Sequence, residues 1–338
     1  MGIGKYIKVI GRGKDGARPL TREQAADLFG QVLDGAVTDL EIGGFCLAMR
    51  IKGETPQEMA GFLDATHQRL NLVPYSANEA SPPSSTPSSP ATSPASSPLP
   101  AAPRAQAQAA SHAARPVIVI PSYNGARKLP VLTPLLALLL ARAGLPVLLH
   151  GTATESTRVY TSKVLLALGI HAKSAITNIA NGEIAFAPTE ILCAGLQRLL
   201  DVRRVVGLRN PAHSVVKLMN PCAGRSLIVS SYTHPEYAIS MAATFELMQS
   251  NALLLRGTEG EPVADPRRMP QMDGFVAGQR GVLQEAQTGT LSNLPDLPKE
   301  FDADTTAAYI QRVMAGDSPV PPSIARQVEH ILHLSTQL

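Results

Sequence analysis

Residues Val117 to Thr152 decide the fold, and they read VIVIPSYNGARKLPVLTPLLALLLARAGLPVLLHGT. A short β-branched run at 117–120 enters a cationic loop at 121–128, which is followed by a long apolar segment and a second apolar run at 147–149. This order predicts a β-loop-α-β unit. Ligands of open α/β sheets bind at the carboxyl ends of the strands, and phosphate is favoured at the amino end of the following helix. The loop is therefore the first candidate for a ligand site.

Residues 1–75 have the sequence features of a small helical bundle. Threonines that can cap a helix stand at Thr21, Thr38 and Thr55, and each is followed three residues later by Gln or Glu. This pairing is the capping-box signature of a helix start. Apolar residues recur at helical spacing after each cap, so we expect an N-terminal helical domain over 1–75.

Residues 76–115 differ in composition, because they are rich in Ser, Pro and Ala and have few large apolar side chains. Such a segment buries too little apolar surface to offset the entropy lost on ordering, which predicts a disordered linker. The segment either tethers the regions on its two sides or is an insertion without a selected role.

Residues 116–338 predict a larger α/β domain with a mostly parallel sheet, because short apolar runs alternate with helical segments. One of these helical segments is expected at Pro188–Leu200. The five expected strands are Val117–Ile120, Val147–His150, Ser174–Ile176, Leu227–Ser230 and Ala252–Arg256.

The net charge of +3 is small, but the basic residues are clustered along the chain. Residues 1–22, 127–173 and 198–225 each carry six basic side chains against one acidic, whereas 226–338 carry seven basic against thirteen acidic. Clusters of this kind indicate an anionic partner, with a phosphate backbone as the leading candidate. The alternative for each cluster is a solvated surface.

Cysteines and apolar runs bear on the cellular compartment. Cys46, Cys193 and Cys222 lie far apart and form no metal-binding spacing, which is typical of reduced thiols. The basic, glycine-rich start of the chain has no apolar signal region, and the apolar run at 130–140 is shorter than the ~20 residues that span a bilayer. We therefore expect a cytoplasmic protein with no membrane partner.

Several motifs follow one another in a recognisable order after the His150-Gly151-Thr152 turn. They are Phe186-Ala187-Pro188, Val202-Arg203-Arg204, Asn220-Pro221 and Arg256-Gly257-Thr258-Glu259-Gly260. With these motifs, and with a helical bundle before the α/β domain, the chain resembles the anthranilate phosphoribosyltransferase superfamily, which includes the pyrimidine nucleoside phosphorylases. The resemblance covers nearly everything except the linker.

Within that superfamily the chain is most similar to the YbiB-type branch, and this resemblance implies DNA binding. The similarity lies in IKVIGRGKDGARPLTREQA at 7–25, RIKGET at 50–55 and RGTEGEPVADPRR at 256–268. The stretch at 50–53 is also well explained as a helix end, where Arg and Lys complement the helix dipole and Gly ends the helix.

The same resemblance shows where this chain departs from the enzymes. The enzymes bind diphosphate with a Gly-Thr-Gly-Gly-Asp loop, and here Pro121 removes an N–H while Tyr123 adds a side chain where close backbone approach is needed. Their lysine and asparagine around the second-strand His-Gly are absent beside His150 and Gly151. Their Mg²⁺-binding Asp-Glu pair falls at Pro262-Val263, near Glu259 and Glu261, which are not that pair. The resemblance thus implies a degenerate substrate loop, made of Ser122, Tyr123, Asn124, Gly125, His150 and Gly151.

Sequence-non-specific nucleic-acid binding, directed at phosphates, is the leading prediction. No cofactor, metal or catalytic residue is expected, and family resemblance implies a homodimer formed through the helical domain. His150 is expected to be a satisfied strand-end histidine. The predicted phosphate-binding residues are Arg12, Lys14, Arg18, Arg127, Lys128, Arg158, Lys163, Arg203, Arg204 and Arg209.

Three alternatives remain from the sequence. One is an active, Mg²⁺-dependent glycosyl- or phosphoribosyltransferase, another is a protein-interaction scaffold that recruits a partner through 76–115, and the third is a degenerate enzyme without a ligand. The sequence leaves open whether DNA or RNA, single- or double-stranded, is bound.

Overall fold

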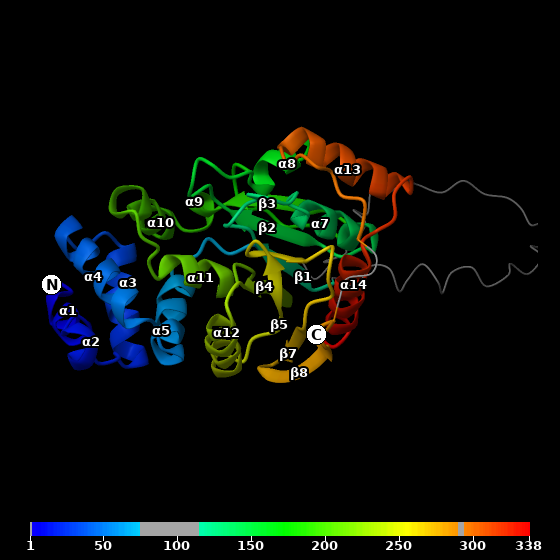
Figure 1. Ribbon diagram of the computed structural model, residues 1–338. Coiled ribbons are helices and arrows are strands. Elements are labelled where there is room, and N and C mark those ends of the chain that lie inside the picture. Colours follow the sequence, from blue (N-terminus) through cyan, green and yellow to red (C-terminus); the bar gives the residue numbers. More distant parts are fainter. Residues whose placement is uncertain (1, 75–114, 290–293) are drawn as a thin grey trace, which may run out of the picture.

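A computed structural model of the chain describes residues 2–74, 115–289 and 294–338. The expected linker at 76–115 lies outside the described residues except for Arg115. Figure 1 shows an N-terminal helical bundle at one end of the molecule and a sheet with its covering helices at the other. The structure thus has the two predicted parts, a helical domain and a larger α/β domain.

The helical domain forms because each of its long helices is started by a threonine cap. Its helices are α1 (Gly4–Ile10), α2 (Gly13–Gly16), α3 (Arg22–Leu33), α4 (Asp39–Lys52) and α5 (Pro56–His67). Complete capping boxes at Thr21, Thr38 and Thr55 begin α3, α4 and α5, as predicted. At the centre, the ring of Phe29 stacks on that of Phe62 at a centroid distance of 4.7 Å.

The α/β domain is built on one sheet with the strand order β3-β2-β1-β4-β5-β7-β8. Neighbouring strands from β3 to β5 are parallel, while β7 and β8 add an antiparallel edge and β6 pairs antiparallel with β5. The strands are β1 (Val117–Pro121), β2 (Val147–Gly151), β3 (Ile184–Pro188), β4 (Ser226–Tyr232), β5 (Ala252–Thr258), β6 (Glu261–Ala264), β7 (Met272–Val276) and β8 (Gln279–Gln284).

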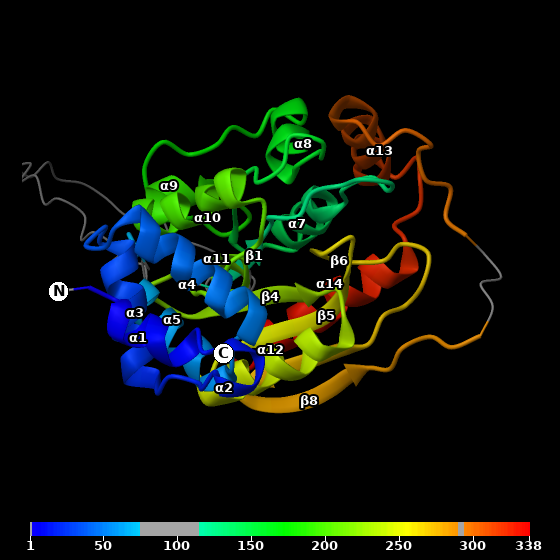
Figure 2. The ribbon, with the colours of Figure 1, turned by 60° about the vertical axis from the view of Figure 1, so that its left-hand side comes forward.

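Alternate residues of the strands enter two separate cores. Ile118 and Ile120 pack with α7 (Thr133–Arg142), α8 (Thr161–Ala167), α13 (Ala303–Ala315) and α14 (Pro322–Ser335). Val117 and Val119 belong to the other core, which continues into the helical domain. That second face is covered by α9 (Thr189–Leu192), α10 (Ala194–Val206), α11 (Ala212–Leu218) and α12 (Pro235–Leu247), and Figure 2 shows the two sets of helices on opposite sides of the sheet. The sheet core therefore holds the helical domain in place beside the carboxyl ends of the strands.

Two predictions about the elements were wrong. Residues 174–176 form no strand, and β3 lies at Ile184–Pro188 instead, where it pairs with β2. The runs at 174–176 and 184–188 are both short and apolar, and they differ in that the second pairs with β2. That pairing joins distant parts of the chain and cannot be predicted from the local sequence. The single helix expected at 188–200 is divided into α9 and α10 at Cys193, whose backbone is extended.

Within residues 2–74, 115–289 and 294–338, no helix combines the length and the apolar character needed to cross a membrane.

A close helix contact inside the bundle gives a test of the fold. A Cβ added at Gly61 of α5 would lie 2.2 Å from the carbonyl oxygen of Arg22, so Gly61→Ala should destabilise the protein by about 3 kcal/mol. Gly4→Ala is the control, because a Cβ there meets no atom within 4 Å, and its effect should stay within about 0.5 kcal/mol. Equal unfolding midpoints in guanidinium chloride for the two variants would contradict this packing.

Candidate functional site

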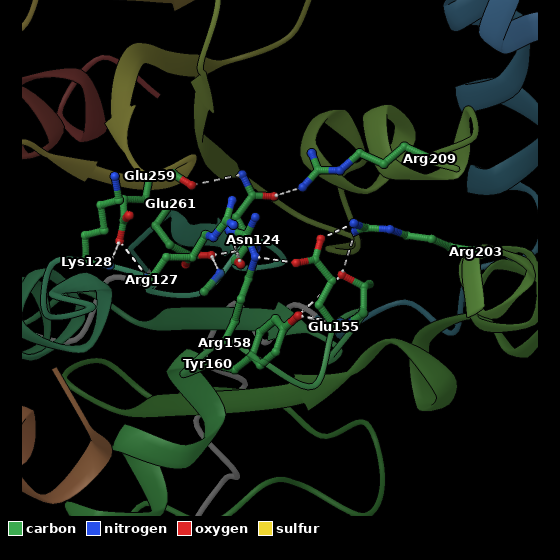
Figure 3. Close-up of polar contacts among 12 residues, drawn as sticks. Asn124, Arg127, Lys128, Glu155, Arg158, Tyr160, Arg203, Arg209, Glu259 and Glu261 are labelled. Atoms are coloured by element: carbon green, nitrogen blue, oxygen red, sulfur yellow. Dashed lines mark hydrogen bonds and ion pairs between the residues drawn. The ribbon is translucent and has the colours of Figure 1, made fainter. Parts of the chain in front are cut away.

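The loop that follows β1 lies at the carboxyl end of the strand, as predicted, and the β5–β6 turn closes over it (Figure 3). Two glycines, Gly151 and Gly260, let the backbone around the loop pack closely against it. A Cβ at Gly151, the last residue of β2, would lie 2.0 Å from the carbonyl oxygen of Ser122, and one at Gly260 would lie 1.6 Å from Asn124 Nδ2. The loop is therefore fixed between the end of β2 and the β5–β6 turn.

The carboxylate of Glu261 fills the inner part of the loop. The backbone N–H groups of Asn124 and Gly125 both donate to Glu261 Oε1 at 2.8 Å. Glu261 Oε2 accepts from the hydroxyls of Ser122 and Thr133, the latter at 3.1 Å. Glu261 is buried, with 2% of its surface exposed. The donors that would hold an anion in this loop are thus already satisfied from within the protein.

A second carboxylate, that of Glu259, caps the outer part of the loop. The backbone N–H groups of Arg127, Lys128 and Leu129 donate to Glu259 Oε2 at 2.8, 3.1 and 3.3 Å. The side chains of Arg127 and Lys128 are exposed, and among the described residues neither forms an ion pair. From the sequence, both glutamates were predicted only to be neighbours of the lost metal pair, because more than a hundred residues separate them from the loop.

Tyr123 and His150 differ from the expectation in one respect. The ring of Tyr123 does not stand in the ligand space but is buried in the core, because its hydroxyl bonds His150 Nδ1 at 2.8 Å and Thr189 Oγ1 at 2.9 Å. Burial lowers the pKa of His150 to about 3 and raises the pKa of Tyr123 above its ordinary range. His150 is therefore a neutral core residue, but the expectation of a satisfied histidine was only half right, because its buried Nε2 has no hydrogen-bond partner among the described residues.

Three predicted cations lie together beside the loop. Arg158 and Arg203 both pair with the carboxylate of Glu155, and Arg158 also donates to the carbonyl oxygen of Asn124 at 2.9 Å. Arg209 donates to Asn124 Oδ1 at 3.4 Å. Burial, and then the charges of Arg203 and Arg158, lower the pKa of Arg209.

The hydroxyl of Tyr160 fixes the loop that carries Glu155. It accepts from the backbone N–H groups of Thr154 at 3.0 Å and of Glu155 at 2.7 Å. Burial acts against ionisation of Glu155, but hydrogen bonds from Arg158 and Arg203 outweigh it and keep the pKa below its ordinary value. Of the positive charges on Arg158, Arg203 and Arg209, one is thus compensated by this carboxylate.

A cleft of about 740 Å³ opens between the helical domain and the carboxyl ends of the strands. Lys217 lies half-buried in its wall, where its ammonium donates to the carbonyl oxygens of Ser231 and Gly260, and the desolvation of this ammonium lowers its pKa to about 8. Glu54, Glu236 and Glu259 also line the cleft. Its basic side chains are Arg50, Arg127, Arg158, Arg209 and Lys217.

The other predicted cations do not line this cleft. Lys128, Lys163 and Arg204 are exposed, and Arg204 pairs with Asp201. Arg12 and Arg18 are exposed near α2, which packs on α4, whereas the side chain of Lys14 lies outside the described part of the structure. Arg50 and Lys217 were not among the predicted site residues, since the first ends a helix and the second lies within a helical segment.

The positions implied for a Mg²⁺ pair do not fit a metal. Pro262 and Val263 lie in β6, and Val263 is buried. Among the residues that the structure describes, no group of three His, Cys, Asp or Glu side chains is placed to hold a metal ion. Magnesium prefers oxygen ligands from carboxylates and substrate phosphates, which these two residues cannot supply.

Comparisons with known proteins agree with this architecture. Residues 5–69 match the helical bundle domain of a glycosyl transferase family. The uncharacterized protein YbiB of Escherichia coli (strain K12) is 39% identical over 329 residues, which cover 96% of this chain and 91% of YbiB. Anthranilate phosphoribosyltransferase of Methanosarcina acetivorans is 27% identical over 267 residues, which cover 76% of this chain and 60% of that enzyme.

Solved structures show the same fold at low sequence identity. Anthranilate phosphoribosyltransferase from Thermus thermophilus superposes with a TM-score of 0.64 at 19% identity, over 95% of this chain and 85% of that one. The enzyme from Saccharomyces cerevisiae, in complex with PRPP and Mg, has a TM-score of 0.60 at 13% identity, over 99% and 88% of the chains.

Replacing Glu261 tests whether its carboxylate holds the loop. Glu261→Ala leaves the N–H groups of Asn124 and Gly125 buried without an acceptor, so the unfolding free energy should fall by about 3 kcal/mol. Glu329→Ala is the control, because Glu329 forms only an exposed pair with Arg326 and should change stability by less than about 1 kcal/mol. Chemical unfolding measures both, and a Glu261→Ala protein as stable as the control would show that the loop does not depend on this carboxylate.

Proposed function

The chain belongs to the family of YbiB, within the anthranilate phosphoribosyltransferase superfamily, and on this scaffold we propose that it binds nucleic acid without sequence specificity. The observation that carries the proposal is the combination of a diphosphate loop closed by Glu261 with uncompensated cations beside it. A scaffold whose loop donors are occupied by its own carboxylate, but which keeps basic side chains around the same position, suits a larger polyanion.

The charge of the cleft supports a polyanionic partner. Five basic side chains line it against three acidic ones, and Glu259 uses one of its oxygens on backbone N–H groups. Lys128 and Lys163 add exposed positive side chains outside the cleft, whereas Arg204 is paired with Asp201. Phosphate contacts of this kind position a nucleic acid without reading its bases.

The aromatic content favours contacts to phosphates over stacking on bases. The chain has no Trp and Tyr123 is buried in the core, which leaves Tyr232 and Tyr237 as the tyrosines that line the cleft, too few for an extended stacking platform. Base stacking on aromatic platforms is a usual device of single-strand binding proteins. Binding should therefore be dominated by electrostatics and should weaken steeply with salt.

Binding to unrelated DNA duplexes at several salt concentrations tests this function. With six to ten phosphate contacts, the plot of log affinity against log salt should have a slope of roughly −5 to −9. Arg127→Ala/Lys128→Ala should weaken binding to all sequences about equally, by roughly tenfold, since two exposed cations are lost. Lys299→Ala/Arg326→Ala removes the same charge outside the cleft and should have a smaller effect. Micromolar or weaker affinity at low salt with a flat slope would refute the proposal.

The rival function is Mg²⁺-dependent phosphoribosyl transfer, which the complex of the yeast enzyme with PRPP and Mg suggests. It is disfavoured because Glu261 occupies the loop donors and Val263 is buried where a metal ligand would be needed. Calorimetric titration with phosphoribosyl pyrophosphate and Mg²⁺ separates the two functions, because only the transferase should release heat of binding.

We also propose a homodimer formed through the helical domain, which would join two basic clefts into one surface. Leu40, Leu47 and Ile51 recur at helical spacing on α4, and 87%, 48% and 66% of their surfaces are exposed. Apolar side chains grouped in this way on one helix are typical of an interaction surface.

Charged substitutions on α4 test the dimer. Leu47→Glu/Ile51→Glu places carboxylates on the exposed apolar face, so the protein should become monomeric while its fold is kept, because neither side chain belongs to the core. Light scattering after size-exclusion chromatography measures the mass, with Val282→Glu on β8 as an equally exposed apolar control. A wild-type monomer, or a variant that remains dimeric, would exclude this interface.

A further inference from the structure

The outer part of the loop has the geometry of an anion site. The N–H groups of Arg127, Lys128 and Leu129 converge on one oxygen of Glu259 at 2.8 to 3.3 Å. Successive backbone N–H groups that point at one position form a concavity that binds anions. Here the bound anion is a side chain of the protein itself, which shows directly that this position accepts an oxyanion.

The surroundings of this position favour a phosphate over the resident carboxylate. Arg127 and Lys128 contribute two exposed positive side chains at the loop that supplies the N–H groups. A phosphodiester carries one negative charge on two terminal oxygens, so it can accept the three N–H groups and contact both cations. The carboxylate of Glu259 is tethered to the β5–β6 turn, so it cannot move to contact both cations as a free phosphodiester can.

The carboxylate of Glu259 can leave the loop N–H groups that hold it, whereas that of Glu261 cannot. Glu259 is half-buried at the tip of the β5–β6 turn, and among the described residues its carboxylate is hydrogen-bonded by loop N–H groups, with the charge of Arg267 close enough to act on it. Its backbone has φ = +53°, a left-handed conformation that is unfavourable for a side-chain-bearing residue. Glu261 lies inside the protein with 2% of its surface exposed, between buried donors. Exchange with an external anion is therefore feasible at the outer position only.

We propose that a phosphodiester group of bound nucleic acid displaces the Glu259 carboxylate and occupies the N–H groups of Arg127, Lys128 and Leu129. This inference rests on the proposed function and adds to it a defined contact. In the free protein, Glu259 keeps the N–H groups satisfied and the loop ordered. In the complex, its carboxylate turns toward solvent and the phosphate accepts the same hydrogen bonds.

Substitution of Glu259 tests the exchange. Glu259→Ala removes the competing anion, so a short DNA duplex should bind this variant about tenfold more tightly than it binds the wild type. Glu236→Ala is the charge-matched control, because Glu236 is exposed and lines the same cleft but makes no contact with the loop N–H groups. It should raise affinity only slightly, through the general change in charge. Glu259→Gln, which keeps the size of the side chain, should give an intermediate gain and guards against loss of folding in the alanine variant.

A spectroscopic measurement on the wild type completes the test. The amide resonances of Arg127, Lys128 and Leu129 should shift when the duplex is added, whereas those of Asn124 and Gly125, held by Glu261, should change little. Equal affinities of Glu259→Ala and Glu236→Ala, or unshifted amides at 127–129 in a protein that does bind the duplex, would overturn the exchange and leave the proposed function standing. Absence of binding by the wild type and by every variant would overturn both.

Discussion

The buried carboxylate of Glu261 is the interaction on which the architecture of the site depends. It accepts hydrogen bonds from the N–H groups of Asn124 and Gly125 and from three hydroxyls, and the ammonium of Lys217 lies near enough to interact with its charge. A buried carboxylate without these donors would be strongly unfavourable, and the donors without it would be equally unsatisfied. The loop after β1 and the strand β6 therefore require each other, although 137 residues separate Asn124 from Glu261.

Asn124 connects the loop held by Glu261 to the arginines beside it. Its N–H group is held by Glu261, its carbonyl oxygen accepts from Arg158, and its side-chain oxygen accepts from Arg209. Figure 3 shows Asn124 between Glu259 and Glu261 on one side and Arg203 and Arg209 on the other. Glu155 in turn holds Arg158 and Arg203 together. The positive charge at the cleft is thus positioned by the same loop whose own donors are occupied.

Much of this could be predicted from the sequence, because it depends on local signals. The capping boxes at Thr21, Thr38 and Thr55 and the apolar run at Val117–Ile120 identified the helical domain and the start of the sheet. The site was predicted less completely. Loss of the glycine-rich loop was visible, but its occupation by Glu261 depends on pairing between β5 and β6, and Lys217 is brought into the cleft only by the packing of α11. Tyr123 was expected in the ligand space, but its hydroxyl is held in the core by His150 and Thr189. These partners come from two other segments of the chain, so the loop sequence alone does not reveal them.

The two glutamates differ in depth, and under the proposed function this difference lets one scaffold exclude a diphosphate from the inner loop and still bind a larger anion at the outer one. A diphosphate that entered the inner loop would have to expel Glu261 into a buried position, where an unpaired charge costs several kcal/mol. A phosphate at the outer loop needs to displace only Glu259, which can turn into water and keep its solvation. Because a hydrogen bond to a charged group contributes about 1.5–3 kcal/mol and three N–H groups are equally available to either anion, small differences in charge nearby decide the outcome. In the proposed complex, Arg127 and Lys128 contact the phosphodiester in addition to the N–H groups, and the depth of each carboxylate decides at which of the two positions an external anion can enter.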